Sequence, residues 1–230
     1  MSATSNKVLF VLTSHDRKGS KPSGYFLSEV THPHRVLADA GYQIDFVSPK
    51  GGKAPLDPDS LDLEDGMNAE FWNNPSLRSA VEHTKRPTDV HAEDYAGIFF
   101  AGGHGAMWDL PEDSEIAALT ANIYDHGGIV GAVCHGPAAL VNVKRSNGEY
   151  LVKDLHVAAF TNDEEREVGL ERVVPFLLAD KLQERGAHHD PAPNWAIKVV
   201  VSGRLVTGQN PASATRVGDA MLTMLTNSTH

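Results

Sequence analysis

The chain has 230 residues, a length that fits one globular α/β domain with insertions. Its 20 Lys and Arg stand against 30 Asp and Glu, and the net charge of −10 argues against a nucleic acid or an anionic membrane as partner. The single cysteine excludes an internal disulfide, no stretch approaches the ~18 apolar residues that span a bilayer, and the first residues lack a signal-type segment. We therefore expect a cytoplasmic protein with a reduced thiol and a small uncharged or electrophilic substrate.

Strand and helix patterns alternate along the chain. In order, they predict a strand at residues 7–12, a helix at 25–40, a strand at 43–47, helical structure at 61–94, a strand at 95–100, a helix at 114–126 and a strand at 129–133. They then predict a strand (HVAAF) within 152–160, two short helices within 164–186, a hairpin at 196–207 and a helix at 212–225.

Several residues mark the ends and breaks of these elements. We expect Pro33 to kink or break the first helix and Gly41 to end it. Ser114 has the side chain of an N-cap, and Pro175 separates the two short helices. The loop at residues 13–23 follows the carboxyl end of the first strand, where open α/β sheets bind ligands.

This alternation predicts an α/β fold, a doubly wound and mostly parallel sheet with helices on both faces. We expect a single domain over residues 1–230, with a small helical, cap-like insertion at about 53–94. The chain shows no internal repeat, low-complexity tract or interdomain linker.

The stretch GGIVGAVCHGPAAL, residues 127–140, has the clearest chemical signature. An apolar run leads into Cys134, and Gly136-Pro137 then opens a helical segment, so the cysteine is expected on a strand-to-helix elbow. An elbow exposes the side chain, and the helix N-terminus and His135 are expected to lower the pKa of the thiol. The alternative is that Cys134 is a small buried apolar residue.

Acidic residues could complete this site. The cluster Asp163-Glu164-Glu165 follows a predicted strand, and Glu164 or Glu165 could orient His135, although acids at that point also suit a helix N-terminus. Glu29 lies on the first helix, and next to a thiol its pKa would be raised towards neutral pH. The alternative for Glu29 is a solvated helix residue.

Two further features bear on the chemistry. Gly102-Gly103 could bring backbone N–H groups near Cys134, where the N–H of His135 would complete an oxyanion hole, or the glycines could simply permit tight packing. The glycine loop at 101–105 lacks a dinucleotide fingerprint, and no Gly-Lys-Ser/Thr occurs. Twelve histidines do not show convincing ligand spacing, so neither a metal nor another cofactor is expected.

The chain resembles the DJ-1/PfpI superfamily, and within it the Hsp31-like group of glutathione-independent glyoxalases and chaperones. The resemblance rests on the motifs SEVTHP, FFAGGHGAMWDLP, GAVCHGPAALV, FTNDEE and TGQNPAS, which run nearly from end to end. It implies a flavodoxin-like fold, similar to class I glutamine amidotransferases, and a homodimer. It also implies that Cys134 is the nucleophile, His135 its partner, Glu29 the buried acid touching the thiol and Glu165 (or Glu164) the third member, with Gly103 and His135 as backbone donors.

From this resemblance the leading hypothesis is conversion of methylglyoxal to lactate, a stress-protective reaction that begins with a hemithioacetal on Cys134. A first alternative is an amide-directed cysteine hydrolase, such as a deglycase, peptidase or amidotransferase-like enzyme. A second is a holdase chaperone or redox sensor that binds unfolded or glycated proteins and carries Cys134 as an oxidisable thiol.

Overall fold

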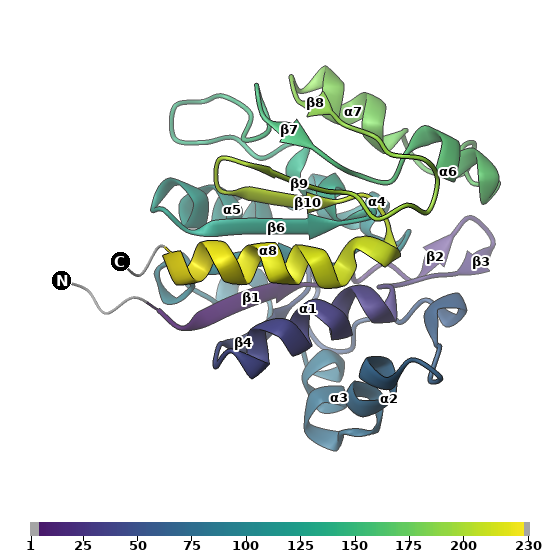
Figure 1. Ribbon diagram of the computed structural model, residues 1–230, viewed down its shortest axis with the longest axis vertical. Helices are drawn as coiled ribbons and strands as arrows, with labels where there is room; N and C mark the ends of the chain where they lie inside the picture. Colours follow the sequence, from purple (N-terminus) through teal and green to yellow (C-terminus); the bar gives the residue numbers. More distant parts are fainter. Residues whose placement is uncertain (1–4, 228–230) are drawn as a thin grey trace.

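The computed structural model describes residues 5–227 and is built on one six-stranded sheet (Figure 1). The strand order is β4-β1-β5-β6-β10-β9, and every neighbouring pair is parallel except β10 and β9. The strands are β1 (Lys7–Val11), β4 (Gln43–Val47), β5 (Gly97–Phe100), β6 (Ile129–Val133), β9 (Val199–Ser202) and β10 (Leu205–Gly208). This confirms the predicted doubly wound, mostly parallel α/β fold and the hairpin near the carboxyl end of the chain.

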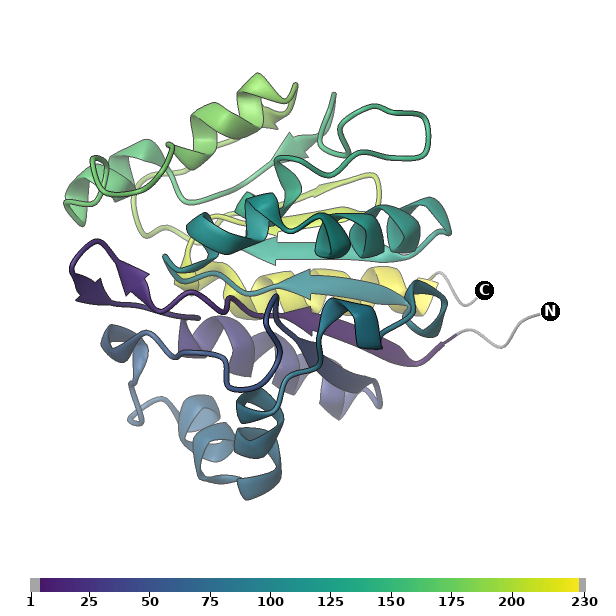
Figure 2. The same cartoon turned by 180° about the vertical axis from the view of Figure 1, so that it is seen from behind.

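Helices cover both faces of the sheet. One face carries α1 (Leu27–Asp39) and α8 (Ala214–Asn227), which also pack on each other (Figure 1). The opposite face carries α4 (Ala106–Asp109) and α5 (Ser114–Asp125), which lie in front of the sheet in Figure 2. Within the described residues, no helix is long and apolar enough to cross a bilayer.

The side chains of β1 show how the sequence builds two cores. Val8 and Phe10 point to the face of α1 and α8, whereas Leu9 and Val11 point to the face of α5, and all four are fully buried. A strand buried on both faces therefore reads as a continuous apolar run. Burial of each such side chain stabilises the fold by about 1.5–3 kcal/mol.

Smaller elements lie outside the six-stranded sheet. They are the hairpin β2 (Arg17–Lys18) and β3 (Lys21–Pro22), the helices α2 (Gly66–Asn73), α3 (Pro75–Glu82), α6 (Asn162–Glu167) and α7 (Leu178–Glu184), and the paired strands β7 (His156–Val157) and β8 (His188–His189). Helices α2 and α3 lie in the segment expected to be a cap, together with short 3-10 turns. The division into one domain with a cap at about 53–94 stays a prediction.

Helix α1 corrects one expectation about proline. It runs unbroken from Leu27 to Asp39 with Pro33 inside it, and the chain leaves the helix at Gly41 with a φ of +91°, as expected of a glycine stop. A Cβ on Gly218 of α8 would lie 3.0 Å from the Cα of Pro33, so the two helices are in close contact at this point. Packing against α8 thus outweighs the one backbone hydrogen bond that a proline removes.

Two other expectations need correction. The N-cap of α5 is Asp113 and not Ser114, because the Asp113 carboxylate accepts the N–H groups of Glu115 (3.0 Å) and Ile116 (2.8 Å). The predicted strand at 156–160 is reduced to β7, which pairs with β8 outside the main sheet. Beyond it, Ala158 N–H donates to the Thr207 hydroxyl, a side chain, so this stretch does not continue a strand ladder.

Candidate active site

Cys134 lies on a sharp turn at the carboxyl end of β6. Its φ is +60°, a conformation that is unfavourable for a residue with a Cβ. The turn is held on both sides, because Cys134 N–H donates to Gly208 O and Cys134 C=O accepts from Phe160 N–H, both at 2.9 Å. The elbow is therefore present as predicted, but a five-residue 3-10 helix, Gly136–Leu140, follows it instead of an α-helix.

His135 connects the thiol to an acid. Its Nδ1 lies 3.4 Å from Cys134 Sγ, and its Nε2 lies 2.7 Å from Oε2 of Glu165. Burial alone would raise the pKa of Glu165, yet the charge and hydrogen bonds of His135 and His104 lower it to about 2. Glu165 is therefore a carboxylate that accepts the Nε2–H of His135, which leaves the Nδ1 lone pair directed at the thiol.

Glu164, the other acid that could have oriented His135, forms different contacts. It closes a capping box with Thr161 at the start of α6. Its Oε1 also accepts from Trp195 N–H, Gln209 Nε2 and Asn210 Nδ2, at 2.9–3.0 Å. Of the two acids, the structure brings Glu165 to His135, and Glu164 ties α6 to the chain around residues 195–210.

Glu29 reaches the thiol from α1 and is fully buried. Its Oε2 accepts the N–H of Gly102 at 2.7 Å, its Oε1 has no hydrogen-bond partner among the described residues, and its carboxyl group interacts with the Cys134 thiol. Burial raises the pKa of Glu29 to about 8, so the carboxyl is mainly protonated at neutral pH. The structure thus contradicts the alternative of a solvated helix residue.

The expected depression of the thiol pKa is wrong. Burial raises the pKa of Cys134 well above its ordinary value, and the neighbouring carboxyl group of Glu29 raises it further. The expectation relied on an exposed thiol at the end of a helix dipole, whereas Cys134 is 3% exposed and only a short 3-10 helix follows. The resting site therefore holds a thiol, and a thiolate has to form during the reaction.

The two predicted glycines differ in what their N–H groups do. Gly102 donates to Glu29 and is not free for a substrate. Gly103, with a φ of +95°, borders the cavity, and in the described chain its N–H has no protein acceptor. The N–H of His135 faces the Cys134 sulfur. Gly103 and His135 thus provide two N–H groups beside the thiol.

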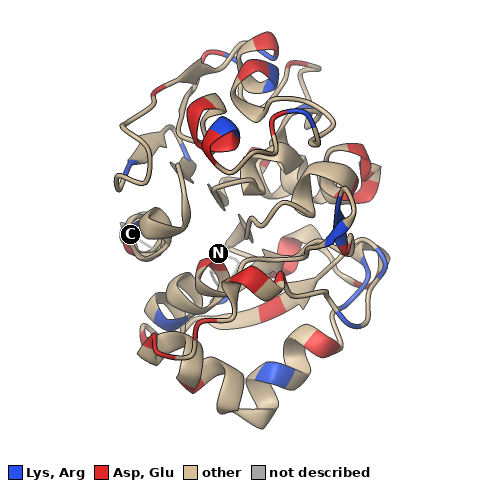
Figure 3. Cartoon of the chain, turned by 90° about the vertical axis from the view of Figure 1, so that its right-hand side faces the viewer, with Lys and Arg blue, Asp and Glu red and all other residues tan. Residues whose placement is uncertain are grey.

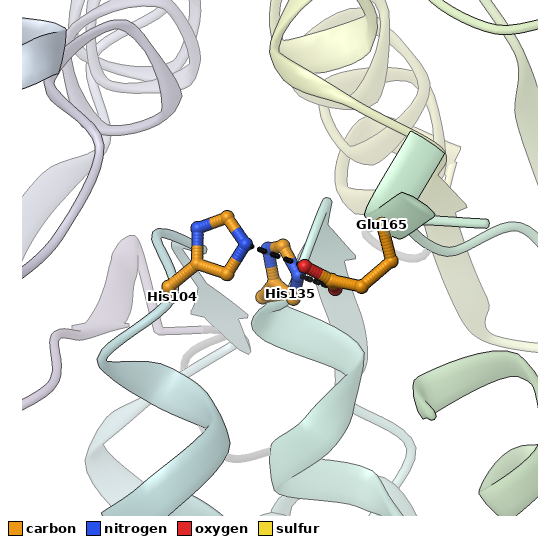
Figure 4. A group of neighbouring side chains, drawn as sticks. All are labelled: His104, His135 and Glu165. Carbon is orange, nitrogen blue, oxygen red and sulfur yellow. Dashed lines mark hydrogen bonds and ion pairs between the residues drawn. The ribbon is translucent and has the colours of Figure 1, made fainter. Parts of the chain in front are cut away.

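His104 is the part of the site that sequence reasoning missed. Its Nε2 lies 2.8 Å from Oε1 of Glu165, and its ring lies 4.1 Å from the ring of His135, centre to centre. Figure 4 shows both imidazoles pointing to the same carboxylate. The available signal was the position of the Ala101–Gly105 loop directly after a buried strand, because such loops meet at the carboxyl edge of a parallel sheet.

A cavity of about 320 Å³ opens over Cys134. It has a partly apolar lining made by Phe26, Phe160, Val168, Leu170, Trp195 and Pro211. Its charged lining includes Lys18, whose Nζ lies 2.8 Å from Asp57 and 2.9 Å from Asp59. Figure 3 faces this end of the molecule, with basic residues on the β2–β3 hairpin and acidic residues on α6. The volume suits a small organic molecule.

The two imidazoles and Glu165 also have the atom types of a metal site. Within the described residues, the ligand atoms of His104, His135 and Glu165 lie within 4.8 Å of one another. However, both carboxylate oxygens and both Nε2 atoms are already engaged in hydrogen bonds of 2.7–2.8 Å with one another. The pairing of imidazoles with a carboxylate accounts for this cluster.

Comparison with known proteins gives a consistent result. Residues 22–224 match the model of the DJ-1/PfpI family. The chain is 33% identical over 222 residues to the glutathione-independent glyoxalase HSP31 of Saccharomyces cerevisiae, covering 90% of this chain and 93% of that one. Among solved structures, Rapid Encystment Protein 24 kDa of Francisella tularensis matches with a TM-score of 0.92 and 42% identity, covering 95% of this chain and 98% of that chain. Glyoxalase III of Candida albicans matches with a TM-score of 0.87 and 30% identity, covering 95% and 96%.

Proposed function

The chain belongs to the DJ-1/PfpI family, and we propose from this that it is a glutathione-independent glyoxalase that converts methylglyoxal to lactate. The observation that carries the proposal is the placement of one buried thiol between an imidazole and a protonated carboxyl group. Cys134 Sγ lies 3.4 Å from Nδ1 of His135, and the thiol also interacts with the buried carboxyl group of Glu29. The site can thus make a thiolate when an aldehyde is present, although its resting thiol is neutral.

The first step is addition of sulfur to the aldehyde. His135 Nδ1 takes the proton from Sγ, and Glu165 stabilises the imidazolium that forms. The protonated Glu29 donates to the sulfur as it becomes negative. Sγ then bonds to C1 of methylglyoxal, the aldehyde oxygen is held by the N–H groups of Gly103 and His135, and the proton returns to that oxygen. The product is a hemithioacetal on Cys134.

The remaining steps are an isomerisation and a hydrolysis. A proton moves from C1 to C2 through an enediol, which turns the hemithioacetal into a thioester of lactate. Water then attacks the thioester carbon, the C–S bond breaks, and lactate and the Cys134 thiol are released. The oxidation of C1 is balanced by the reduction of C2, so no external oxidant, reductant or glutathione takes part.

The direct test is lactate formation from methylglyoxal without glutathione. We expect purified protein to form lactate and Cys134→Ala to form none above the uncatalysed rate. If Cys134→Ala consumed methylglyoxal at the parental rate, the mechanism would be wrong. Peptide, glutamine and glycated substrates tested in parallel would reveal an amide hydrolase through a higher kcat/KM on one of them.

A homodimer and a cytoplasmic location are further proposals that rest on the family resemblance. Chaperone and redox-sensor activity remain alternatives, with unfolded or glycated proteins as partners. The raised pKa and the burial of Cys134 work against rapid oxidation of the resting thiol, because the thiolate is the form that peroxide attacks. Analytical ultracentrifugation tests the dimer, and suppression of client aggregation by Cys134→Ala tests a thiol-independent chaperone.

A further inference from the structure

We propose that His104 is a catalytic residue of this site, the base that carries the substrate proton from C1 to C2 after His135 has activated the thiol. The inference rests on the proposed glyoxalase function and assigns its isomerisation step to a residue for which neither the motifs nor the relatives' names give a role. It follows from which groups face the cavity and which of their atoms are already engaged.

Glu29 is poorly placed to reach the substrate carbons. It is fully buried and, among the described residues, does not belong to the lining of the cavity. One of its oxygens accepts the Gly102 N–H, and the carboxyl group contacts the thiol. Glu29 therefore interacts with the sulfur of Cys134, whereas a substrate in the cavity would contact other residues.

His104 borders the cavity and has a free acceptor atom. Its Nε2 donates to Glu165, because the low pKa of Glu165 makes that carboxylate an acceptor only. A neutral imidazole that donates through Nε2 keeps a lone pair on Nδ1. Nδ1 has no hydrogen-bond partner within residues 5–227, and in Figure 4 the second ring nitrogen is turned away from the carboxylate. The side chain is 13% exposed and lines the cavity together with Cys134.

The other ionisable groups of the cavity lining are unsuitable as a base. Lys18 and Lys21 carry ammonium groups, which have no lone pair. Asp57 and Asp59 both accept from Lys18, at 2.8 and 2.9 Å. The Nδ1 of His135 faces the sulfur. His104 is thus the basic nitrogen of the lining that the first step leaves unused.

Because His135 and His104 share the carboxylate of Glu165, the two imidazoles carry a proton one after the other and not at the same time. Burial and the positive charge of His135 lower the pKa of His104 to about 4, whereas the hydrogen bond and charge of Glu165 raise it. With the rings 4.1 Å apart, two imidazolium ions would repel each other strongly. Once His135 has returned its proton to the hemithioacetal oxygen, the Glu165 charge can stabilise a proton on His104 instead.

The proton balance of the step is closed. His104 Nδ1 takes the proton from C1, the C1–H electron pair forms the C1=C2 bond, and the C2 oxygen takes a proton from a solvent water to give the enediol. The imidazolium then gives its proton to C2, while the C1 hydroxyl returns one proton to the solvent and becomes the thioester carbonyl. His104 ends neutral, and no co-reactant is consumed.

The test separates addition from isomerisation with His104→Gln, whose amide can still donate to Glu165 but accepts no proton. Lactate formation from methylglyoxal is measured by NMR, and hemithioacetal formation is measured as protection of Cys134 from iodoacetamide by methylglyoxal. We expect lactate formation to fall about 100-fold, as for loss of a general base. The methylglyoxal concentration that protects Cys134 from iodoacetamide should be the same as for the wild-type protein. In His104→Ala, added imidazole is expected to restore part of the lactate formation. His126→Gln, an exposed histidine at the end of α5, is the matched control and should behave as wild type.

Three other outcomes would contradict either the role of His104 or the proposed function. Parental lactate formation by His104→Gln would overturn the assignment of the base. Loss of Cys134 protection together with lactate formation would also overturn it, because His104 would then act by positioning His135. If the wild-type protein forms no lactate at all, the proposed function itself fails, which is a separate outcome from an active enzyme that does not need His104.

Discussion

Replacing Glu29 with glutamine is expected to stabilise the protein while removing the acid beside the thiol. Burial raises the pKa of Glu29 to about 8, against 4.5 for an ordinary carboxyl. The unfolded chain therefore releases this proton above about pH 4.5, and the folded protein releases it only near pH 8. A group with a raised carboxyl pKa reduces stability progressively across that interval as pH rises.

The size of the effect follows from the same two pKa values. Each pH unit corresponds to about 1.36 kcal/mol. Between pH 4.5 and pH 7 the wild-type protein should lose about 3 kcal/mol through Glu29, and by pH 8 about 4 kcal/mol. Glutamine has nearly the same shape, its amide oxygen can accept the Gly102 N–H, and it does not ionise. Glu29→Gln should therefore escape this loss.

The measurement is urea unfolding of wild type and Glu29→Gln at pH 5, 6, 7 and 8. The difference in unfolding free energy should be small at pH 5 and grow in favour of the variant by roughly one kcal/mol per pH unit. Glu64→Gln, at an exposed position, controls for the loss of one negative charge and should show no such growth. Lactate formation by Glu29→Gln should fall about 100-fold, typical of losing an acid–base group. A stability difference that stays flat from pH 5 to pH 8 would refute the raised pKa and the reasoning built on it.

Three other predictions concern the thiol, the glycine loop and the two acids. Alkylation of Cys134 by iodoacetamide should be slow at pH 7, and its midpoint should lie above that of free cysteine, because the thiol pKa is raised. A midpoint at or below that of free cysteine would contradict this. Gly103→Ala should lower the unfolding free energy by about 2 kcal/mol or more in urea titrations, because its Cβ would lie 2.2 Å from Gly24 O at a φ of +95°. Gly66→Ala is the control, since its Cβ meets nothing within 4 Å, and equal losses in the two variants would count against the steric argument. Glu164→Ala should lower the unfolding free energy by about 3 kcal/mol in the same titrations, because it leaves buried donors unpaired. Glu165→Gln should mainly reduce lactate formation. The reverse pattern would show that the roles of the two acids are exchanged.

Local patterns in the sequence were sufficient for the sheet and for the elbow. The apolar runs at β1, β5 and β6 predict buried strands because a strand covered on both faces needs apolar side chains at every position. The stretch at residues 127–140 predicts the turn that carries Cys134, because an apolar strand is followed within three residues by Gly136-Pro137, which opens a helical segment. The hairpin of β9 and β10 follows in the same way from the turn residues Ser202-Gly203.

The same patterns fail where a contact crosses elements. The strand expected through Phe160 does not form, because that stretch bonds to Cys134 C=O and to a side chain of β10 instead of to a neighbouring ladder. Pro33 does not break α1, because packing against α8 holds the helix together. In both places tertiary contacts override a local preference.

By itself, the sequence determined which residue carries the reactive group, because the elbow around Cys134 is a local property of a strand, a glycine and a proline. Only the tertiary structure decided what surrounds that thiol. Glu29 meets the Gly102 N–H across 73 residues, and Glu165 meets His135 across 30 residues and His104 across 61. The charge state of the site also depends on burial, which no short stretch of sequence encodes: it raises the pKa of both Cys134 and Glu29, and it leaves Glu165 ionised because two imidazoles face it.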